Sequence, residues 1–157
     1  MIKNNKKKIN SLNLGSITYI FPVYNEQDRL NNLFRYLDKN VKKKQEVILV
    51  NDGSQDNSKN LIKNFISKKK NFKLISYKKN MGKGYALKKG VIKSKKDWIL
   101  TLDVDLSANF SQINSWIRKR YISEDKKYSY FGSRTKDGAK IKALFFRKFL
   151  GNFFRIF

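Results

Sequence analysis

The stretch Trp98-Ile99-Leu100-Thr101-Leu102-Asp103-Val104-Asp105 decides how the rest of this sequence is interpreted. Its first five residues form a largely apolar run that is typical of a strand, and two carboxylates one residue apart follow directly. If strand geometry continues, Asp103 and Asp105 point the same way while Val104 turns inward. Carboxylate oxygens are the ligands that Mg²⁺ and Mn²⁺ prefer. The stretch therefore predicts a strand that ends at a cation site.

Strand-like and helix-like segments alternate along the whole chain. The predicted strands are residues 17–21, stopped by Pro22, and residues 46–50, 72–77, 98–102 and 128–132. The predicted helices are residues 27–37, residues 59–66, a helix opened by Gly82-Lys83-Gly84 that runs to about Val91, and residues 113–121. Strands separated by helices imply βαβ units. The prediction is an α/β fold, with a mostly parallel, Rossmann-like sheet and flanking helices in a single domain over residues 15–140.

Acidic residues are scarce, and several of them follow predicted strands. The chain has 36 basic and only 12 acidic residues. Four of the acids come just after a strand: Glu26, Asp52, Asp103 and Asp105. Open α/β sheets bind ligands outside the carboxyl ends of their strands. These four side chains are therefore the first candidates for a binding site.

Three other loops have both a functional and an ordinary structural interpretation. Residues 22–26 can place Tyr24 and Glu26 beside a nucleobase and ribose, or they simply start a helix that Asn25 caps. Gly82-Lys83-Gly84 combines a flexible loop, a cation and a helix N-terminus that can receive a phosphate, but it lacks the spacing of a Walker P-loop. Arg134 can hold a phosphate through its planar guanidinium, or it lies on the surface.

Composition excludes several classes of protein. The chain has no Cys and no His, which excludes a disulfide framework, a thiolate zinc site and a histidine general base, and a reducing cytoplasmic location fits. The formal charge of +24 indicates either an anionic partner or solvated lysines, and we favour the lysines because most of the basic residues are Lys. Residues 1–14 form a basic tail with no signal-like apolar region, and no segment is long and apolar enough for a membrane span.

Residues 141–157 are apolar and aromatic, with three embedded cations. Leu144, Phe145, Phe149 and Phe153 form a stripe at helical spacing. This pattern is typical of an amphipathic helix that lies in a membrane interface. A core helix that has lost its covering elements would show the same pattern, so both interpretations stay open.

Six motifs in order carry a resemblance to a known family. They are Pro22-Val23-Tyr24-Asn25-Glu26, Val50-Asn51-Asp52-Gly53-Ser54, Asn80-Met81-Gly82-Lys83-Gly84, Asp103-Val104-Asp105-Leu106-Ser107, Gly132-Ser133-Arg134 and the segment from Arg147 to Phe154. In this order they resemble the family 2 glycosyltransferases of the GT-A fold. The Gly-Lys-Gly and Asp-Val-Asp-Leu-Ser variants look most like the dolichyl-phosphate β-glucosyltransferase branch and its bacterial relatives.

The resemblance implies a site for a nucleoside-diphosphate sugar. Pro22, Tyr24, Glu26 and Asp52 would surround the nucleobase and ribose, with Lys83 near the nucleotide. Asp103 would approach the ribose or the metal, and Asp105 would be the principal ligand of a Mg²⁺ or Mn²⁺ ion on the diphosphate. Arg134 and Arg147 would contact phosphates, including that of the acceptor. The implied activity is an inverting transfer to a polyprenyl phosphate by a protein peripheral to the cytoplasmic face of the membrane.

The sequence departs from the family pattern at its C-terminal end. Family members continue beyond the last motif into elements that carry acceptor-side residues. Residues 141–157 would therefore be the start of an incomplete acceptor region, and a partner chain could supply the missing part. Two alternatives stay open: a non-catalytic module that binds a nucleotide or a partner, and a transferase acting on a polysaccharide or other soluble acceptor. A nucleic-acid partner is not expected, because no recognisable binding module accompanies the charge.

Overall fold

The computed structural model describes residues 16–108, 110–118 and 129 of the chain. Within these residues, strands and helices alternate as β1 (Ile17–Val23), α1 (Gln27–Asn40), β2 (Glu46–Asp52), α2 (Ser58–Ile66), β3 (Phe72–Tyr77), α3 (Lys83–Lys93), β4 (Trp98–Thr101) and α4 (Phe110–Arg118). All of them belong to the first of two compact units, which are Met1–Ser123 and Glu124–Phe157. The domain boundaries predicted at residues 14 and 140 lie outside the described residues.

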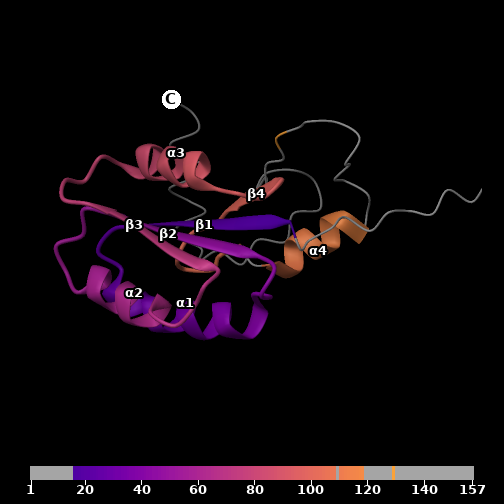
Figure 1. The fold of residues 1–157 in the computed structure, drawn as a ribbon, viewed down its shortest axis with the longest axis horizontal. Helices are drawn as coiled ribbons and strands as arrows, with labels where there is room; N and C mark the ends of the chain where they lie inside the picture. The colour runs from indigo at the N-terminus through magenta and orange to yellow at the C-terminus, as the bar shows by residue number, and fades with distance from the viewer. Residues whose placement is uncertain (1–15, 109, 119–128, 130–157) are drawn as a thin grey trace, which may run out of the picture. The chain divides into compact units, whose positions relative to one another are not determined.

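The described strands form one parallel sheet in the order β3-β2-β1-β4 (Figure 1). β1 pairs with β2 on one side and with β4 on the other, and β3 pairs with the outer side of β2. Val23 lies opposite Asn51, so β1 and β2 end almost level. Because all four strands run the same way, their carboxyl ends meet at one edge of the sheet. This arrangement confirms the predicted α/β class and brings the candidate loops to a common edge.

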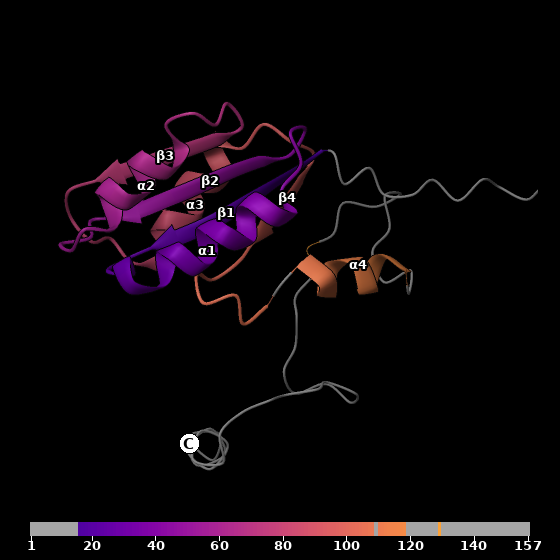
Figure 2. The same cartoon turned by 90° about the horizontal axis from the view of Figure 1, so that it is seen from below.

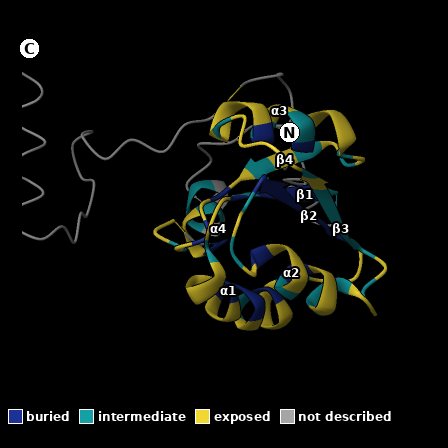
Figure 3. Ribbon diagram, turned by 90° about the vertical axis from the view of Figure 1, so that its left-hand side faces the viewer, coloured by how far each residue is buried: buried dark blue, intermediate teal, exposed yellow. Residues whose placement is uncertain are grey.

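Helices cover both faces of the sheet. α1 and α2 pack on one face and α3 on the other, with the buried strands between them (Figure 3). Seen from the α1 side, α1 runs along β1 (Figure 2). Leu30, Leu33 and Leu37, predicted to share one face of α1, are completely buried. Burying each of these side chains contributes about 1.5–3 kcal/mol to folding, and this packing fixes the loop that precedes α1.

α3 approaches the opposite face very closely. Ala86 of α3 packs with Ile20, Ile48 and Val50 of the two central strands. At Gly90, an added Cβ would lie only 2.5 Å from the Cγ2 atom of Ile20. A glycine is therefore needed for this helix to reach the sheet, and its position fixes where the N-terminus of α3 emerges.

Pro22 does not stop β1, and that prediction was wrong. The strand continues through Pro22 to Val23. The carbonyl of Ile20 accepts a hydrogen bond from the N–H of Leu102, so alternate residues of β1 turn their backbone groups toward β4. Pro22 is two residues further on, beyond the last pair between β1 and β4. Its missing N–H therefore faces a side where no ladder bond is needed.

The last described helix starts earlier than predicted. α4 begins at Phe110 and ends at Arg118, whereas the sequence pattern indicated residues 113–121. The Phe110 ring stacks on Tyr19 with centroids 4.1 Å apart, and its N–H donates to the hydroxyl of Tyr36 at 2.8 Å. These tertiary contacts anchor the first turn, and a periodicity argument cannot detect them.

Two further predicted elements fall almost wholly on residues that the structure does not describe. The fifth strand, residues 128–132, is represented only by Ser129, which has no regular secondary structure, and the helix over residues 141–157 lies outside the described residues. Among the helices that are described, none has the length and apolar character required to span a membrane.

Candidate functional site

Asp52 is a buried carboxylate at the end of β2. It is only 3% exposed, and its Oδ1 atom accepts a hydrogen bond from the backbone N–H of Met81 at 2.8 Å. The hydroxyl of Tyr77 lies nearby, and its pKa is raised first by burial and then by the Asp52 carboxylate. Asp52 thus holds the loop between β3 and α3 against the end of its own strand.

Gly53 makes this contact between the two loops possible. Its φ of +69° lies in the left-handed region, which glycine adopts without strain. A Cβ at this position would lie 2.5 Å from the backbone nitrogen of Asn80 and 2.5 Å from the backbone carbon of Lys79. The two backbones are therefore in direct contact, which brings the Met81 N–H within reach of Asp52.

Lys83 and Asp103 form an ion pair across the edge of the sheet. The Nζ of Lys83, the first residue of α3, lies 2.6 Å from Oδ1 of Asp103. Both side chains are largely solvent-exposed, at 61% and 49%. An exposed pair of this kind contributes little to stability. Its importance is positional, since it brings the Gly82-Lys83-Gly84 loop to the first of the two aspartates after β4.

Asp103 and Asp105 lie in a turn and not on a continuing strand, which corrects the predicted geometry. β4 ends at Thr101, the N–H of Leu106 donates to the carbonyl of Asp103 at 3.2 Å, and Leu106 has a φ of +54°. Val104 is buried as expected, and both aspartates are exposed. Oδ1 of Asp105 accepts the N–H of Ser107 at 2.9 Å. The turn, anchored by Val104, presents both carboxylates to solvent.

The loop after β1 carries Tyr24 and Glu26. Tyr24 is 44% exposed, and Glu26 forms an ion pair of 2.8 Å with Arg29 on the next turn of α1. The pKa of Arg29 is raised, first by the hydrogen bond and charge of Glu26 and to a smaller extent by the charge of Asp105. Arg29 therefore pairs with the first loop through Glu26 and is close enough to Asp105 for their charges to interact. Sequence inspection missed it, because no strand end or motif marks a residue inside α1.

Asn25 does not cap α1, and that expectation was wrong. The residue before the helix is Glu26, and no side chain at that position makes a capping hydrogen bond. Asn25 instead has a φ of +52° and contacts the loop after β2, where its N–H donates to Oγ of Ser54 at 3.0 Å. The loops after β1 and β2 are therefore joined directly.

The structure brings most of the predicted site residues to one edge of the sheet. Asp52, Lys83 and Asp103 are linked through the loop between β3 and α3, while Glu26 and Asp105 both act on Arg29. Half-buried Pro22 lies in β1 close to this edge. Arg134 and Arg147 lie outside the described residues, so their predicted contacts with phosphates stay predictions.

The carboxylates at this edge fit a divalent cation that binds together with a phosphate-bearing ligand. Across the described part of the chain, no three His, Cys, Asp or Glu side chains are grouped closely enough to hold a metal ion. Asp103 and Asp105 are two exposed carboxylates in one turn. Mg²⁺ is commonly held by one or two carboxylates, several waters and substrate phosphates. The two aspartates could hold Mg²⁺ or Mn²⁺ in this way, with phosphate oxygens completing the coordination.

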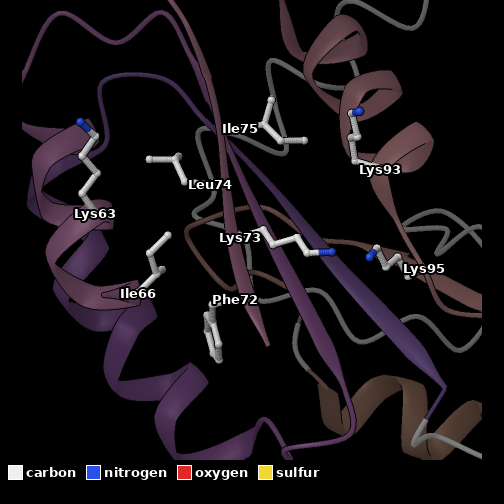
Figure 4. A pocket seen from close by; sticks show the side chains of 8 residues that line it. All are labelled: Lys63, Ile66, Phe72, Lys73, Leu74, Ile75, Lys93 and Lys95. Carbon is white, nitrogen blue, oxygen red and sulfur yellow. The ribbon is translucent and has the colours of Figure 1, made fainter. Parts of the chain in front are cut away.

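A pocket of about 710 Å³ lies elsewhere, around the outer strand β3. Figure 4 shows it between Lys63 and Ile66 of α2, residues 72–75 of β3, and Lys93 and Lys95 near the end of α3. None of the predicted site residues lines it. It is therefore separate from the candidate site, which is an open edge formed by loops.

Comparison with known proteins agrees with the motifs. The model of the family described as glycosyl transferase family 2 matches residues 18–153. A dolichyl-phosphate beta-glucosyltransferase from Trichomonas vaginalis is 30% identical over 150 residues, which cover 86% of this chain and 45% of that protein. A poly-beta-1,6-N-acetyl-D-glucosamine synthase from Staphylococcus aureus is 33% identical over 102 residues, covering 65% of this chain and 24% of the synthase. The chain thus spans less than half the length of either relative.

The fold is shared with solved structures. The mannosyltransferase PcManGT from Pyrobaculum calidifontis, determined in complex with GDP-Man and Mn²⁺, superposes with a TM-score of 0.57 at 19% identity, over 65% of this chain and 31% of that one. The similarity supports the GT-A fold for the described sheet and helices. Because the family model covers most of the sequence, the chain belongs to glycosyl transferase family 2.

Proposed function

We propose that this chain binds a nucleoside-diphosphate sugar at the carboxyl edge of its sheet and transfers the sugar to a polyprenyl phosphate. The observation that carries the proposal is that this edge has a buried carboxylate at one position and exposed carboxylates at another. Asp52 is buried at the end of β2, whereas Asp103 and Asp105 are exposed after β4. A nucleotide needs both environments: a fixed pocket for its base and an open, cation-binding end for its diphosphate.

Asp52 is suited to recognise the base. A carboxylate only accepts hydrogen bonds, so it selects a base edge that presents an N–H group, as uracil and guanine do. One oxygen of Asp52 already accepts the N–H of Met81, which holds the side chain in one orientation. Tyr24 is exposed on the neighbouring loop and would cover a face of the base, with Pro22 and Glu26 completing the pocket around base and ribose.

Asp103 and Asp105 are suited to the diphosphate end. Asp105 would be the principal ligand of Mg²⁺ or Mn²⁺, and Asp103 would assist or contact the ribose. The cation supplies a Lewis acid that neutralises negative charge on the departing nucleoside diphosphate. Lys83, held beside Asp103 at 2.6 Å, is placed to contact the nucleotide phosphates, and Arg134 and Arg147 are further candidates for phosphate contacts.

The transfer itself makes small demands on side-chain acid–base chemistry. An oxygen of the acceptor phosphate attacks the anomeric carbon as the bond from that carbon to the nucleoside diphosphate breaks, which inverts the configuration. This nucleophile is already anionic, so no side chain has to remove a proton from it. A chain without histidine can therefore support the reaction.

The relatives support two possible acceptors. The name of the Trichomonas relative specifies dolichyl phosphate, which favours a lipid phosphate at the cytoplasmic face of the membrane, with residues 141–157 lying in the interface. The name of the staphylococcal relative specifies a polysaccharide product, which keeps a polysaccharide acceptor as the second candidate. A partner chain could supply further acceptor-side residues.

Calorimetric titration tests the nucleotide proposal. The chain is titrated with UDP, GDP, UDP-glucose and GDP-mannose, each with and without Mn²⁺. We expect binding of one base series, strengthened by the cation. No binding of any of the four ligands would refute the proposed function, and binding that does not respond to Mn²⁺ would refute the role of Asp103 and Asp105.

Liposome flotation tests the membrane proposal separately. We expect the full chain to float with vesicles that contain anionic lipid, less so at high salt, and a variant lacking residues 144–157 to remain in the soluble fraction. Flotation that is unaffected by this deletion would show that the predicted helix is not the anchor.

A further inference from the structure

Five hydrogen bonds join the loop after β1 to the loop after β2. We call this set, between residues 25–27 and residues 54–58, the loop clamp. Its members are Asn25 N–H to Ser54 Oγ at 3.0 Å, Gln55 N–H to Asn25 Oδ1 at 2.9 Å, Glu26 N–H to Ser58 Oγ at 3.0 Å, Gln27 N–H to Asp56 Oδ2 at 3.0 Å, and Asn57 N–H to Gln27 Oε1 at 3.0 Å. All five connect a backbone N–H on one loop to a side-chain oxygen on the other.

Asn25 takes part in the clamp through both its backbone and its side chain. Its backbone N–H donates to Ser54 and its side-chain oxygen accepts from Gln55. Its φ of +52° lies in the left-handed region, which Asn adopts more readily than most residues. The conformation and the two hydrogen bonds therefore act together, and the requirement for Asn comes from the neighbouring loop and not from the start of α1.

The second half of the clamp closes the N-terminus of α1. α1 has no capping side chain of its own. The N–H groups of Glu26 and Gln27 instead donate to Ser58 and Asp56 of the neighbouring loop. Burial alone would raise the pKa of Asp56, but the hydrogen bonds from Ser58 and the N–H of Gln27 outweigh it, and the pKa is lowered. Asp56 is therefore a charged acceptor at neutral pH, where it holds the first turn of α1 in place.

The clamp lies between the residues proposed to surround the base. Asn25 separates Tyr24 from Glu26 in the sequence, and Ser54 follows Asp52 by two residues. Fixing a binding loop before the ligand arrives reduces the ordering cost of association. We propose that Asn25 is a positioning residue, which holds Tyr24 and Glu26 in register with Asp52 so that the two loops recognise one nucleoside together. This inference rests on the proposed nucleotide function.

A series at position 25 separates the hydrogen bond from the backbone conformation. Asn25→Gly keeps the left-handed conformation without strain but removes the acceptor for Gln55. Asn25→Asp keeps both the acceptor and the tolerance of this conformation. Ser54→Ala removes the acceptor on the opposite loop and provides an independent arm. Each variant of the full chain is titrated with UDP and GDP plus Mn²⁺, and with the corresponding monophosphates without metal, and its melting temperature is measured.

We expect Asn25→Gly and Ser54→Ala to bind the preferred diphosphate about three- to tenfold more weakly, the loss expected for one hydrogen bond. The monophosphate should weaken by the same factor, because the clamp acts at the nucleoside end, and Asn25→Asp should stay within about twofold of the parent. Unchanged affinity in Asn25→Gly and Ser54→Ala, or equal losses in Asn25→Gly and Asn25→Asp, would overturn the inference. A parent chain that binds no nucleotide would overturn the proposed function and this inference with it.

Discussion

Asp52→Asn is the substitution that tests the proposed base pocket most directly. Asn has nearly the same shape as Asp, and its side-chain oxygen can keep the hydrogen bond that Met81 donates at 2.8 Å. The second oxygen, however, is replaced by an NH₂ group, which cannot accept from a base N–H. At a residue that is 3% exposed, leaving such groups unpaired costs about 1–3 kcal/mol, or about 5- to 150-fold in nucleotide affinity.

Glu46→Gln is the matched control, at the opposite end of the same strand. Glu46 is also buried, at 5% exposed, and accepts hydrogen bonds from Thr18 Oγ1 at 2.7 Å and from the N–H of Lys95 at 2.8 Å. It is the first residue of β2, about 20 Å from Asp52 along the strand. Both substitutions turn a buried carboxylate into an amide, but only one of them lies at the candidate site.

The two variants are compared by calorimetric titration with UDP and GDP and by thermal unfolding. We expect Asp52→Asn to lose affinity with little change in melting temperature, and Glu46→Gln to lose stability with unchanged affinity. The enhancement of binding by Mn²⁺ should be the same in both variants and the parent, because neither residue is on β4. Equal losses of affinity in the two variants would show that a weakened sheet, and not a lost base contact, explains the effect.

Two further substitutions and one pH dependence test other parts of the structure. Gly53→Ala should lower the unfolding free energy by about 1–3 kcal/mol in denaturant titrations, because its Cβ would collide with the backbone of Asn80 and its φ is +69°. Asp105→Asn should abolish the Mn²⁺ enhancement of diphosphate binding while the metal-free monophosphate still binds. The pKa of Glu46 is lowered because hydrogen bonds from Lys73 and Thr18 outweigh the effect of its burial. The charge of Glu46 therefore stabilises the fold at pH values above its ordinary pKa of 4.5, and this contribution is lost as the pH falls through the lowered pKa. The stability gap between the parent and Glu46→Gln should therefore narrow in acid, and a gap that stays constant below that pH would contradict the assignment.

The parts of the fold that the sequence predicts well are those set by local pattern. The apolar runs of β1 and β2 and the stripe of Leu30, Leu33 and Leu37 specify burial without reference to distant residues. The alternation of strand and helix then leaves a parallel sheet as the natural solution. The location of Asp52 and Asp103 at one edge follows from that topology, which is why the candidate site could be placed before the structure was known.

The features that the sequence did not predict depend on contacts between loops. Asn25 resembles a helix cap in sequence, and only the proximity of Ser54 assigns its hydrogen bonds elsewhere. The ion pair of Lys83 with Asp103 joins two elements whose separation in space no local pattern encodes. Pro22 was expected to end β1, but the effect of a proline on a strand depends on which neighbouring strand its backbone faces. Each of these is a tertiary relation and not a local propensity.

The exposure of the carboxylates explains how one edge could serve both ends of a nucleotide. Asp52 is buried and bound by a backbone N–H, so its geometry cannot adjust without the cost of an unpaired group. The pair between Lys83 and Asp103 is exposed, and pairs of this kind contribute only about 0–1 kcal/mol. Exchanging that pair for a cation and phosphate therefore costs little. In the proposed function, rigid recognition belongs at the base, where one edge must be selected, and exchangeable charge belongs at the diphosphate, which must bind, react and leave.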